Sequence, residues 1–544
     1  MDRPKISTRN KLLVLTAVMA SLLEIIDTSI VNVSIPTMMG NLGATLDEIS
    51  WVITGYIIAN AVVLPIASWM SEQIGRKVYY TGCIILFTAA SVACGLAPNL
   101  HVLILFRVVQ GFAGGALLPT SQALIYEAFP KEMAGMASAL YGMSVMIGPT
   151  IGPTLGGYLT DNFGWRSIFN INLPVGIVVM ILSYLLVEDV GFDPNQKKAE
   201  AIPGQVAAKK SLFKSKPNRT PVDSLGLVLL VAGIGSLQYV LERGNAQDWF
   251  SDTSIVICSI TAVTSIVGLI WWELHTPHPI LQLRHFANVT FRYGVFMMAM
   301  VGSLLYGLIF VIPIFANTVL NFTATQTGEL FIPGALAAAA MMPIIGSQIR
   351  KRDPRVLIGT GVVIMLTAVL FISRFNSQTS VGGMFWPLLL RGMAMAYLFV
   401  PINSTVLTQF SGAAIGQAAG MLNLFRQLGG SIFIALLSTL LQDEQVRAMG
   451  VMSTHLTYFD TMATQASHMF SNGMHAKMSA SLGLGNFSMD AVKILYFKAK
   501  KEAFVIAYQK TIYIAGLLFM LSIIPLIKMK PKRLSAKDAI PDAH

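Results

Sequence analysis

The chain has 544 residues, of which 54% are hydrophobic and only 12% are charged, and its mean hydropathy is +0.64. A soluble domain carries about 25% charged residues, so this composition excludes an ordinary soluble protein and indicates an integral membrane protein. The net charge of +11 would suit nucleic-acid binding, but no basic helix or aromatic reading surface accompanies it. We therefore expect no nucleic-acid partner and assign the charge to cytoplasmic loops.

The predicted elements, in chain order, are fourteen apolar helices. Each is long enough to cross a bilayer, which takes about 20 residues, so the sequence predicts an all-α integral membrane protein with 14 transmembrane helices. The helices are expected near 11–35, 50–71, 79–97, 101–126, 135–158, 168–187, 223–242, 254–272, 293–317, 327–347, 356–374, 383–407, 417–441 and 507–528. The first apolar segment is too long for the hydrophobic region of a cleavable signal peptide.

Basic residues gather in alternate loops, at 76–77, 131, 197–219 and 350–355, and near both ends of the chain. Lysine and arginine mark the cytoplasmic side of membrane proteins. Both termini are therefore expected in the cytoplasm, which requires an even number of spans. The polar, proline-containing segment 188–222 is expected to be a cytoplasmic linker.

The first span contains two acidic residues, Glu24 and Asp27. A charge at the centre of a membrane helix costs roughly 2.5–3.5 kcal/mol, so such groups are usually paired, protonated or functional. Residues three apart share one face of a helix, and two buried carboxylates close together titrate as a unit. The pattern predicts a proton-coupling site. The alternative is a structural role, as a helix cap or an ion-pair partner.

The fourth span contains Arg107 and Gln110, followed by Gly111. Arginine keeps its proton, so Arg107 is predicted to be the fixed counter-charge that a carboxylate binds and releases. An arginine that only snorkels or binds a carbonyl is the alternative.

The fifth span carries a cluster of glycine and proline residues. Glycines four apart give a helix a smooth face that a second helix can approach closely, and prolines remove backbone donors and bend the helix. The cluster predicts a bendable, tightly packed helix, and consists of Gly148, Pro149, Gly152, Pro153, Gly156 and Gly157.

The short turn after the second span contains Glu72, Gly75 and Arg76. The acid and the two bases of this turn, Glu72, Arg76 and Lys77, are predicted to form ionic contacts that break when two halves of the protein rock. Simple orientation by positive charge is the alternative.

Three further polar residues in or beside spans, Asn32, Arg391 and Arg426, are candidates for a substrate cavity. The pair Arg391-Gly392 in the twelfth span also echoes the fourth-span motif, which suggests two related helical halves with a site between them. The three cysteines lie in apolar segments without metal or disulfide spacing, and no Ser/His/Asp set or phosphate loop is present. We therefore expect no metal, no cofactor other than the proton gradient, and no enzymatic activity.

These motifs resemble the major facilitator superfamily, and within it the fourteen-helix drug:proton antiporters. The matching segments are Glu24 to Pro36, Arg107 to Gly111, Gly148 to Gly157 and Trp165 to Gly176. The loop after the second span departs from the family pattern, because serine replaces a glycine and Glu72 replaces an aspartate.

The resemblance is closest to the EmrB-like multidrug exporters, on the segments Leu241–Gly244, Asp248–Phe250 and Trp272–Leu274. It implies a bacterial inner-membrane protein that works with a periplasmic membrane-fusion adaptor (EmrA-like) and an outer-membrane channel (TolC-like). Glu24 departs from this subgroup, where a neutral amide is expected, and could favour cationic substrates.

The resemblance also implies the domain organisation. The expected parts are a six-helix half at 1–187, the linker 188–222, two inserted helices at 223–272, a second six-helix half at 273–528 with a large periplasmic loop at 443–505, and a cytoplasmic tail at 529–544. The periplasmic loop is expected to dock the adaptor. Its histidines and methionines make Cu(I) binding a weaker alternative.

The sequence thus predicts a proton-driven antiporter that exports amphipathic or hydrophobic compounds, and the resemblance implies that it is the inner-membrane part of a tripartite pump. One alternative is a dedicated exporter of a single metabolite, such as a siderophore or a fatty acid. A non-transporting membrane sensor or scaffold is a weaker alternative, because it would not need intramembrane charges.

Overall fold

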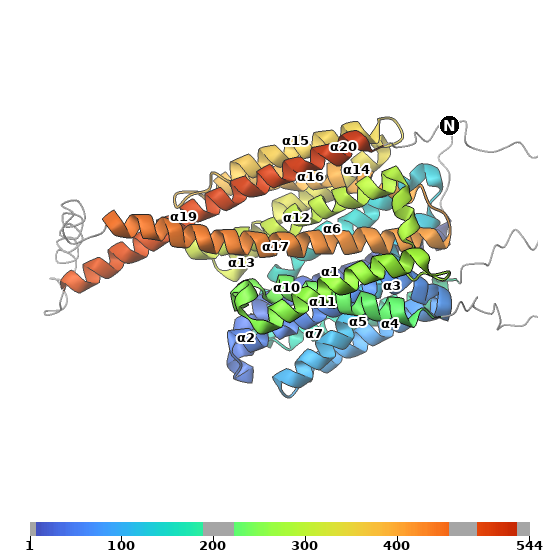
Figure 1. Ribbon diagram of the computed structural model, residues 1–544, viewed down its shortest axis with the longest axis horizontal. Coiled ribbons are helices and arrows are strands. Elements are labelled where there is room, and N and C mark those ends of the chain that lie inside the picture. The colour runs from blue at the N-terminus through green and yellow to red at the C-terminus, as the bar shows by residue number, and fades with distance from the viewer. Residues whose placement is uncertain (1–6, 189–221, 456–486, 530–544) are drawn as a thin grey trace, which may run out of the picture.

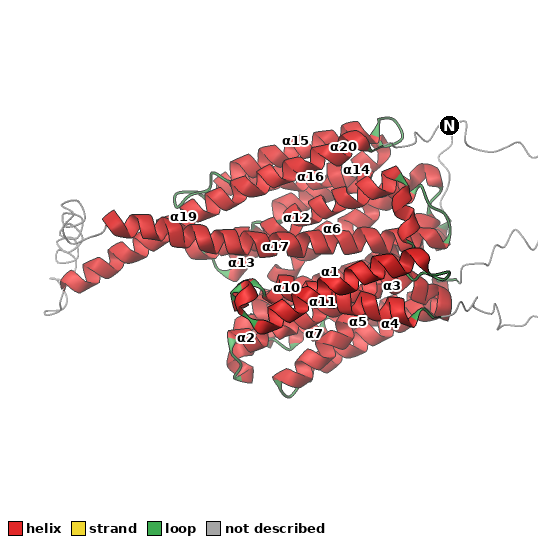
Figure 2. Ribbon diagram, in the orientation of Figure 1, coloured by secondary structure: helices red, strands yellow, loops and turns green. Residues whose placement is uncertain are grey.

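The computed structural model describes residues 7–188, 222–455 and 487–529. The described residues form helices joined by short loops (Figure 2). Fourteen of these helical segments are long and apolar enough to cross a membrane, which confirms the number of predicted spans. The linker 188–222 and the tail 529–544 lie almost wholly outside the described residues, as do the histidines and methionines between 456 and 486.

The first half of the bundle contains six long helices that pack together. Helix α1 contacts the fourth, fifth and sixth of them, so it lies at the centre of this half. The long helices are α1 (Thr8–Leu42), α3 (Trp51–Ile74), α4 (Arg76–Gly95), α5 (Leu100–Ala128), α6 (Ala134–Phe163) and α8 (Asn172–Leu186), with the short helices α2 (Leu46–Ile49) and α7 (Ser167–Asn170) between them.

The second half repeats this arrangement with six more long segments. They are α12 (Val289–Leu320), α14 (Ile332–Gln348), α15 (Pro354–Ile372), α16 (Val381–Leu407), α17 (Ala413–His455) and α19 (Phe487–Phe519), with short α13 (Ala324–Glu329) before α14 and α20 (Ile523–Lys528) at the end. The two halves meet where α14 packs on α6 and where α17 packs on α3 and α5.

Two further helices lie between the halves in the sequence, α10 (Ser224–Arg243) and α11 (Thr253–His275). They pair with each other, and α10 also contacts α3 of the first half and α17 of the second. The outward face of α11 is covered by exposed branched side chains such as Ile257 and Val267, as expected for a helix that faces lipid.

The two ends of the bundle differ. One end, which we call the basic end, holds the start of α1, the basic turns 76–77 and 350–352 and the end of α20. At the opposite end α17 and α19 project beyond the other helices (Figure 1). Helix α17 has 43 residues, and at 1.5 Å per residue this is about 64 Å, twice the thickness of a bilayer core.

The projecting helices account for both ends of the segment 443–505. The sequence predicts that this segment is polar with a helix near 491–508, and in the structure α17 continues to His455 and α19 begins at Phe487. The sequence between the predicted spans is polar, so a hydropathy window ends each span too early although the helix continues past the membrane.

Candidate functional site

Asp27 lies on α1 in the interior of the first half and is completely buried. Its carboxylate accepts three hydrogen bonds from two other helices. Arg107 Nη1 donates to Oδ2 at 2.6 Å, while Gln110 Nε2 and Asn172 Nδ2 donate to Oδ1 at 2.8 and 2.9 Å. Asp27 therefore ties α1 to α5 and α8 through one titratable group.

Arg107 is held in place from several sides. Its Nε donates to the backbone carbonyl of Val52 at 3.1 Å, its Nη1 also donates to Gln110 Oε1 at 2.9 Å, and its guanidinium lies 4.2 Å from the centre of the Tyr56 ring. Breaking a buried ion pair by removing one partner typically costs 3–5 kcal/mol. Losing the charge on Asp27 would therefore weaken the contacts that join α1 to α5 and α8.

Glu24 lies one turn before Asp27 and is 2% exposed. Asn60 Nδ2 donates to its Oε1 at 2.9 Å and the Tyr56 hydroxyl to the same oxygen at 3.5 Å, while Oε2 has no partner. The two acids thus share one side of α1, as predicted, but each has its own set of partners. A buried carboxyl oxygen without a donor is a position where a proton can reside.

The second half contributes a positive charge to this region. Arg426 on α17 is 2% exposed, and its Nη2 donates to Asn423 Oδ1 at 3.0 Å, while Nε and Nη1 have no hydrogen-bond partner among the described residues. Glu24 and Arg426 interact electrostatically, but no ion pair within 4 Å joins them in the described chain. The buried acids of the first half therefore lie within electrostatic range of a buried positive charge of the second half.

A chain of neutral side chains connects the halves toward the basic end. Gln122 Nε2 donates to Asn403 Oδ1 at 2.7 Å, and Asn423 Nδ2 donates to Gln122 Oε1 at 2.7 Å. The Tyr141 hydroxyl donates to Asn423 at 2.8 Å. Sequence reasoning missed this network, although amides inside apolar spans were a visible signal.

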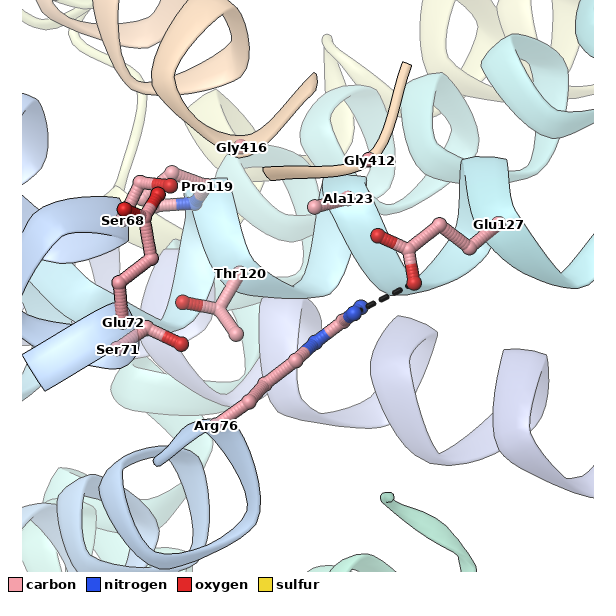
Figure 3. Close-up of a pocket in the computed structure, with 10 residues that line it drawn as sticks. All are labelled: Ser68, Ser71, Glu72, Arg76, Pro119, Thr120, Ala123, Glu127, Gly412 and Gly416. Carbon is pink, nitrogen blue, oxygen red and sulfur yellow. Dashed lines mark hydrogen bonds and ion pairs between the residues drawn. The ribbon is translucent and has the colours of Figure 1, made fainter. Parts of the chain in front are cut away.

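The turn after the second span contains an ionic contact. Arg76 forms an ion pair at 2.5 Å with Glu127 on α5, which belongs to the same half (Figure 3). Glu72 instead accepts a hydrogen bond at 3.2 Å from Gln417 of the other half. The turn itself requires Gly75, whose φ of 97° is unfavourable for other residues. Glu72 therefore makes a hydrogen bond between the halves, whereas the ion pair of Arg76 lies within the first half.

The glycines of α6 allow close packing against α1. A Cβ atom on Gly148 would lie 2.4 Å from the Ile25 side chain, one on Gly152 would lie 1.9 Å from Ser29 Oγ, and one on Gly156 would lie 2.7 Å from the Ile30 carbonyl. Pro149 and Pro153 lie in the same helix. Helix α6 therefore approaches the helix that carries both acids along the predicted glycine face.

Two cavities lie between α6 and the second half. The larger one, of about 660 Å³, is bounded by α6, α13 and α14, and a smaller one beside it is lined by Arg391. Asn32 is exposed and lines neither cavity, and Arg426 also lies outside both. Of the three predicted cavity residues, Arg391 lines the smaller of these two cavities.

The comparison with known families agrees with this arrangement. The model of the Major Facilitator Superfamily matches residues 17–434. The chain belongs to the major facilitator superfamily. The predicted family and fold are thereby confirmed, and the family is one of transporters.

Relatives and solved structures of this superfamily resemble the chain over most of its length. The multidrug export protein EmrB of Escherichia coli K12 is 31% identical over 92% of each chain, and the fatty acid resistance protein FarB of Neisseria gonorrhoeae is 30% identical over 94% of each. The structure of the human organic anion transporter MFSD10 covers 97% of this chain and 100% of its own, with a TM-score of 0.56 and 13% identity. The proton:xylose symporter XylE covers 97% and 98%, with a TM-score of 0.55 and 14% identity.

The two halves of the chain are packed as related units, and each has a buried arginine on its fourth long helix, Arg107 on α5 and Arg391 on α16. The adjacent glycines also have matching contacts. A Cβ on Gly111 would collide with the backbone of Tyr56 on α3, and one on Gly392 with the backbone of Gly334 on α14. The echo noted in the sequence therefore corresponds to similar packing.

Proposed function

We propose that the chain is a proton-driven antiporter that exports amphipathic or hydrophobic drugs and other toxic compounds across the inner membrane. The observation that carries this proposal is the buried ion pair of Asp27 and Arg107, with Glu24 one helical turn away. The names of relatives such as EmrB and the colistin resistance protein EmrB of Acinetobacter baumannii, 29% identical over 88% of each chain, support multidrug export.

The coupling step follows from the contacts of Asp27. The carboxylate binds Arg107 when it is charged, and a proton on Asp27 removes that charge and weakens its hold on Arg107. Because Asp27 contacts residues of both α5 and α8, proton binding changes the packing of α1 against two neighbours. The proton gradient is the energy source, and no other cofactor takes part.

The proposed orientation places the basic end, with both termini, in the cytoplasm. The projecting ends of α17 and α19 then reach into the periplasm. There they dock a membrane-fusion adaptor (EmrA-like) that connects to an outer-membrane channel (TolC-like), which would make the chain the inner-membrane part of a tripartite pump.

Dedicated export of one metabolite is the second candidate, and the fatty acid resistance named for the FarB relative favours it. A sensor or scaffold has less support, because it has no need for the costly buried charges of Asp27 and Arg107. We propose no enzymatic activity.

The test uses the purified full-length protein in liposomes with an imposed pH gradient and no other energy source. Addition of a lipophilic cation or a neutral amphiphile on the cytoplasmic-equivalent side should dissipate the gradient as substrate moves the other way. Substrate movement without any proton flux would refute the antiport.

A further inference from the structure

A second buried arginine in the membrane region lies outside the Asp27 network. Arg391 on α16 is 6% exposed, its Nη2 donates to the Leu305 carbonyl at 3.2 Å, and its guanidinium lies 5.5 Å from the centre of the Phe331 ring. Its Nε has no hydrogen-bond partner, and among the described residues no carboxylate lies within 4 Å of it. A buried charge without an opposite charge is costly, and in a membrane it usually marks a functional site.

Arg391 faces space that a ligand can occupy. It lines a cavity of about 20 Å³, enough for roughly one water-sized group. Thr150 and Ala335 line both this cavity and the neighbouring one of about 660 Å³. The larger cavity also contains the buried Thr154 hydroxyl, which has no partner. Its remaining wall is largely apolar, with Ile147, Ile151, Leu155, Ile332 and Leu336.

The distribution of charge favours one orientation of a ligand. Among the described residues, Asp161 is the only charged one that lines the larger cavity. It lies eleven residues beyond Thr150 on α6, which is about 16 Å along the helix. A negative group would be repelled at the Asp161 end and attracted to Arg391. An apolar chain would fill the space between them.

The two halves differ in how they use their buried arginines. Arg107 forms an ion pair with Asp27 at 2.6 Å. Its positive charge is therefore neutralised within the proposed proton site. Within the part of the chain that the structure describes, Arg391 has only a carbonyl and an aromatic ring as partners, so its charge is available to a ligand.

We propose that Arg391 and the adjoining cavity form a binding site for amphipathic anions. A carboxylate binds the Arg391 guanidinium, and the apolar chain lies between α6 and α14. This site defines one substrate class of the exporter and in that respect rests on the proposed function. A charge-assisted hydrogen bond to arginine supplies affinity that an alcohol or a quaternary ammonium of equal chain length lacks.

The test measures equilibrium binding of radiolabelled dodecanoate to the full-length protein in lipid nanodiscs, with empty nanodiscs as background. Dodecanol and dodecyltrimethylammonium are the neutral and cationic probes of equal chain length. Arg391→Gln should weaken dodecanoate binding by about 10- to 100-fold and leave the two other probes within about twofold. Arg374→Gln, which changes an exposed arginine after α15, is the matched control and should bind like the wild type.

Two further variants keep the proposal falsifiable if Arg391→Gln fails to fold. Arg391→Lys retains the charge without the planar fork and should give intermediate affinity, and Leu336→Trp fills the apolar cavity and should weaken all three probes. Absence of saturable dodecanoate binding to the wild type would overturn the proposal, as would unchanged dodecanoate affinity in both Arg391 variants. Because binding is measured without a proton gradient, its outcome is independent of the test of proton antiport.

Discussion

Gln122 on α5 donates a 2.7 Å hydrogen bond to Asn403 on α16, and this contact joins the two halves of the transporter toward their basic end. Both side chains are buried, and Gln122 also accepts a hydrogen bond from Asn423. A transporter that opens alternately to its two sides must break such a contact in one of its states. The network therefore stabilises the state in which the basic end is closed.

Replacing Gln122 with leucine should shift the protein toward the state that is open at the basic end. The substitution removes two hydrogen bonds between the halves and leaves the polar groups of Asn403 and Asn423 without those partners. Spin labels at the exposed positions Lys131 and Lys351 should report a larger population of long distances. Gln378→Leu, in an exposed loop, is the control, and identical distance distributions in the two variants would contradict the assigned role.

Arg107→Ala should abolish export, and Arg107→Lys should restore only a small part of it. Lysine keeps a positive charge but cannot contact Val52, Asp27 and Gln110 with one planar group, as Arg107 does. Efflux rates per correctly inserted molecule are the measurement. Wild-type efflux by the alanine variant would show that Arg107 is only structural.

Glu24→Gln should weaken the export of cationic substrates more than that of neutral ones. Glutamine can keep the contacts to Asn60 and Tyr56, but it cannot be ionised and therefore cannot attract Arg426 or a cationic substrate as an ionised Glu24 can. Loss of a charge interaction worth about 1.4 kcal/mol lowers affinity tenfold. We expect the export of a monovalent cation to fall by this factor. Equal losses for cationic and neutral substrates would instead indicate a general defect in coupling or folding.

Gly152→Ala should destabilise the first half, whereas Gly157→Ala should be tolerated. The new methyl group at residue 152 would lie 1.9 Å from Ser29 Oγ, but at residue 157 the nearest atom, Thr325 Oγ1, is 3.6 Å away. Overpacking of this kind typically costs 1–3 kcal/mol. The melting temperatures of the two variants are measured by thermal unfolding in nanodiscs. Equal melting temperatures would show that α1 and α6 can accommodate the methyl group without loss of stability.

The sequence predicts the membrane spans and the charged residues inside them. Fourteen spans follow from hydropathy, and Asp27 and Arg107 stand out because a charge in a membrane helix is rare. Their direct contact, and their shared partner Gln110, agree with that reasoning.

Other parts of the site could not be predicted because they depend on contacts between distant segments. Gln122 and Asn403 are 281 residues apart. Neutral amides cost less in a membrane than charges do, so their presence in a span is a weaker indication of a functional site. Arg76 has acids available on two helices, and only the packing of α4 against α5 selects Glu127 over Glu72. The orphan Nε of Arg391 likewise depends on which groups surround it in three dimensions.

The most direct test of the central claim, that Asp27 couples proton movement to export, compares Asp27→Asn with the wild type in liposomes under an imposed pH gradient. Asparagine can still accept hydrogen bonds from Gln110 and Asn172 but cannot take up a proton. We predict that substrate addition causes no proton flux in the variant, while substrate binding stays within about twofold of the wild type. Substrate-driven proton flux at the wild-type rate in Asp27→Asn would contradict the account.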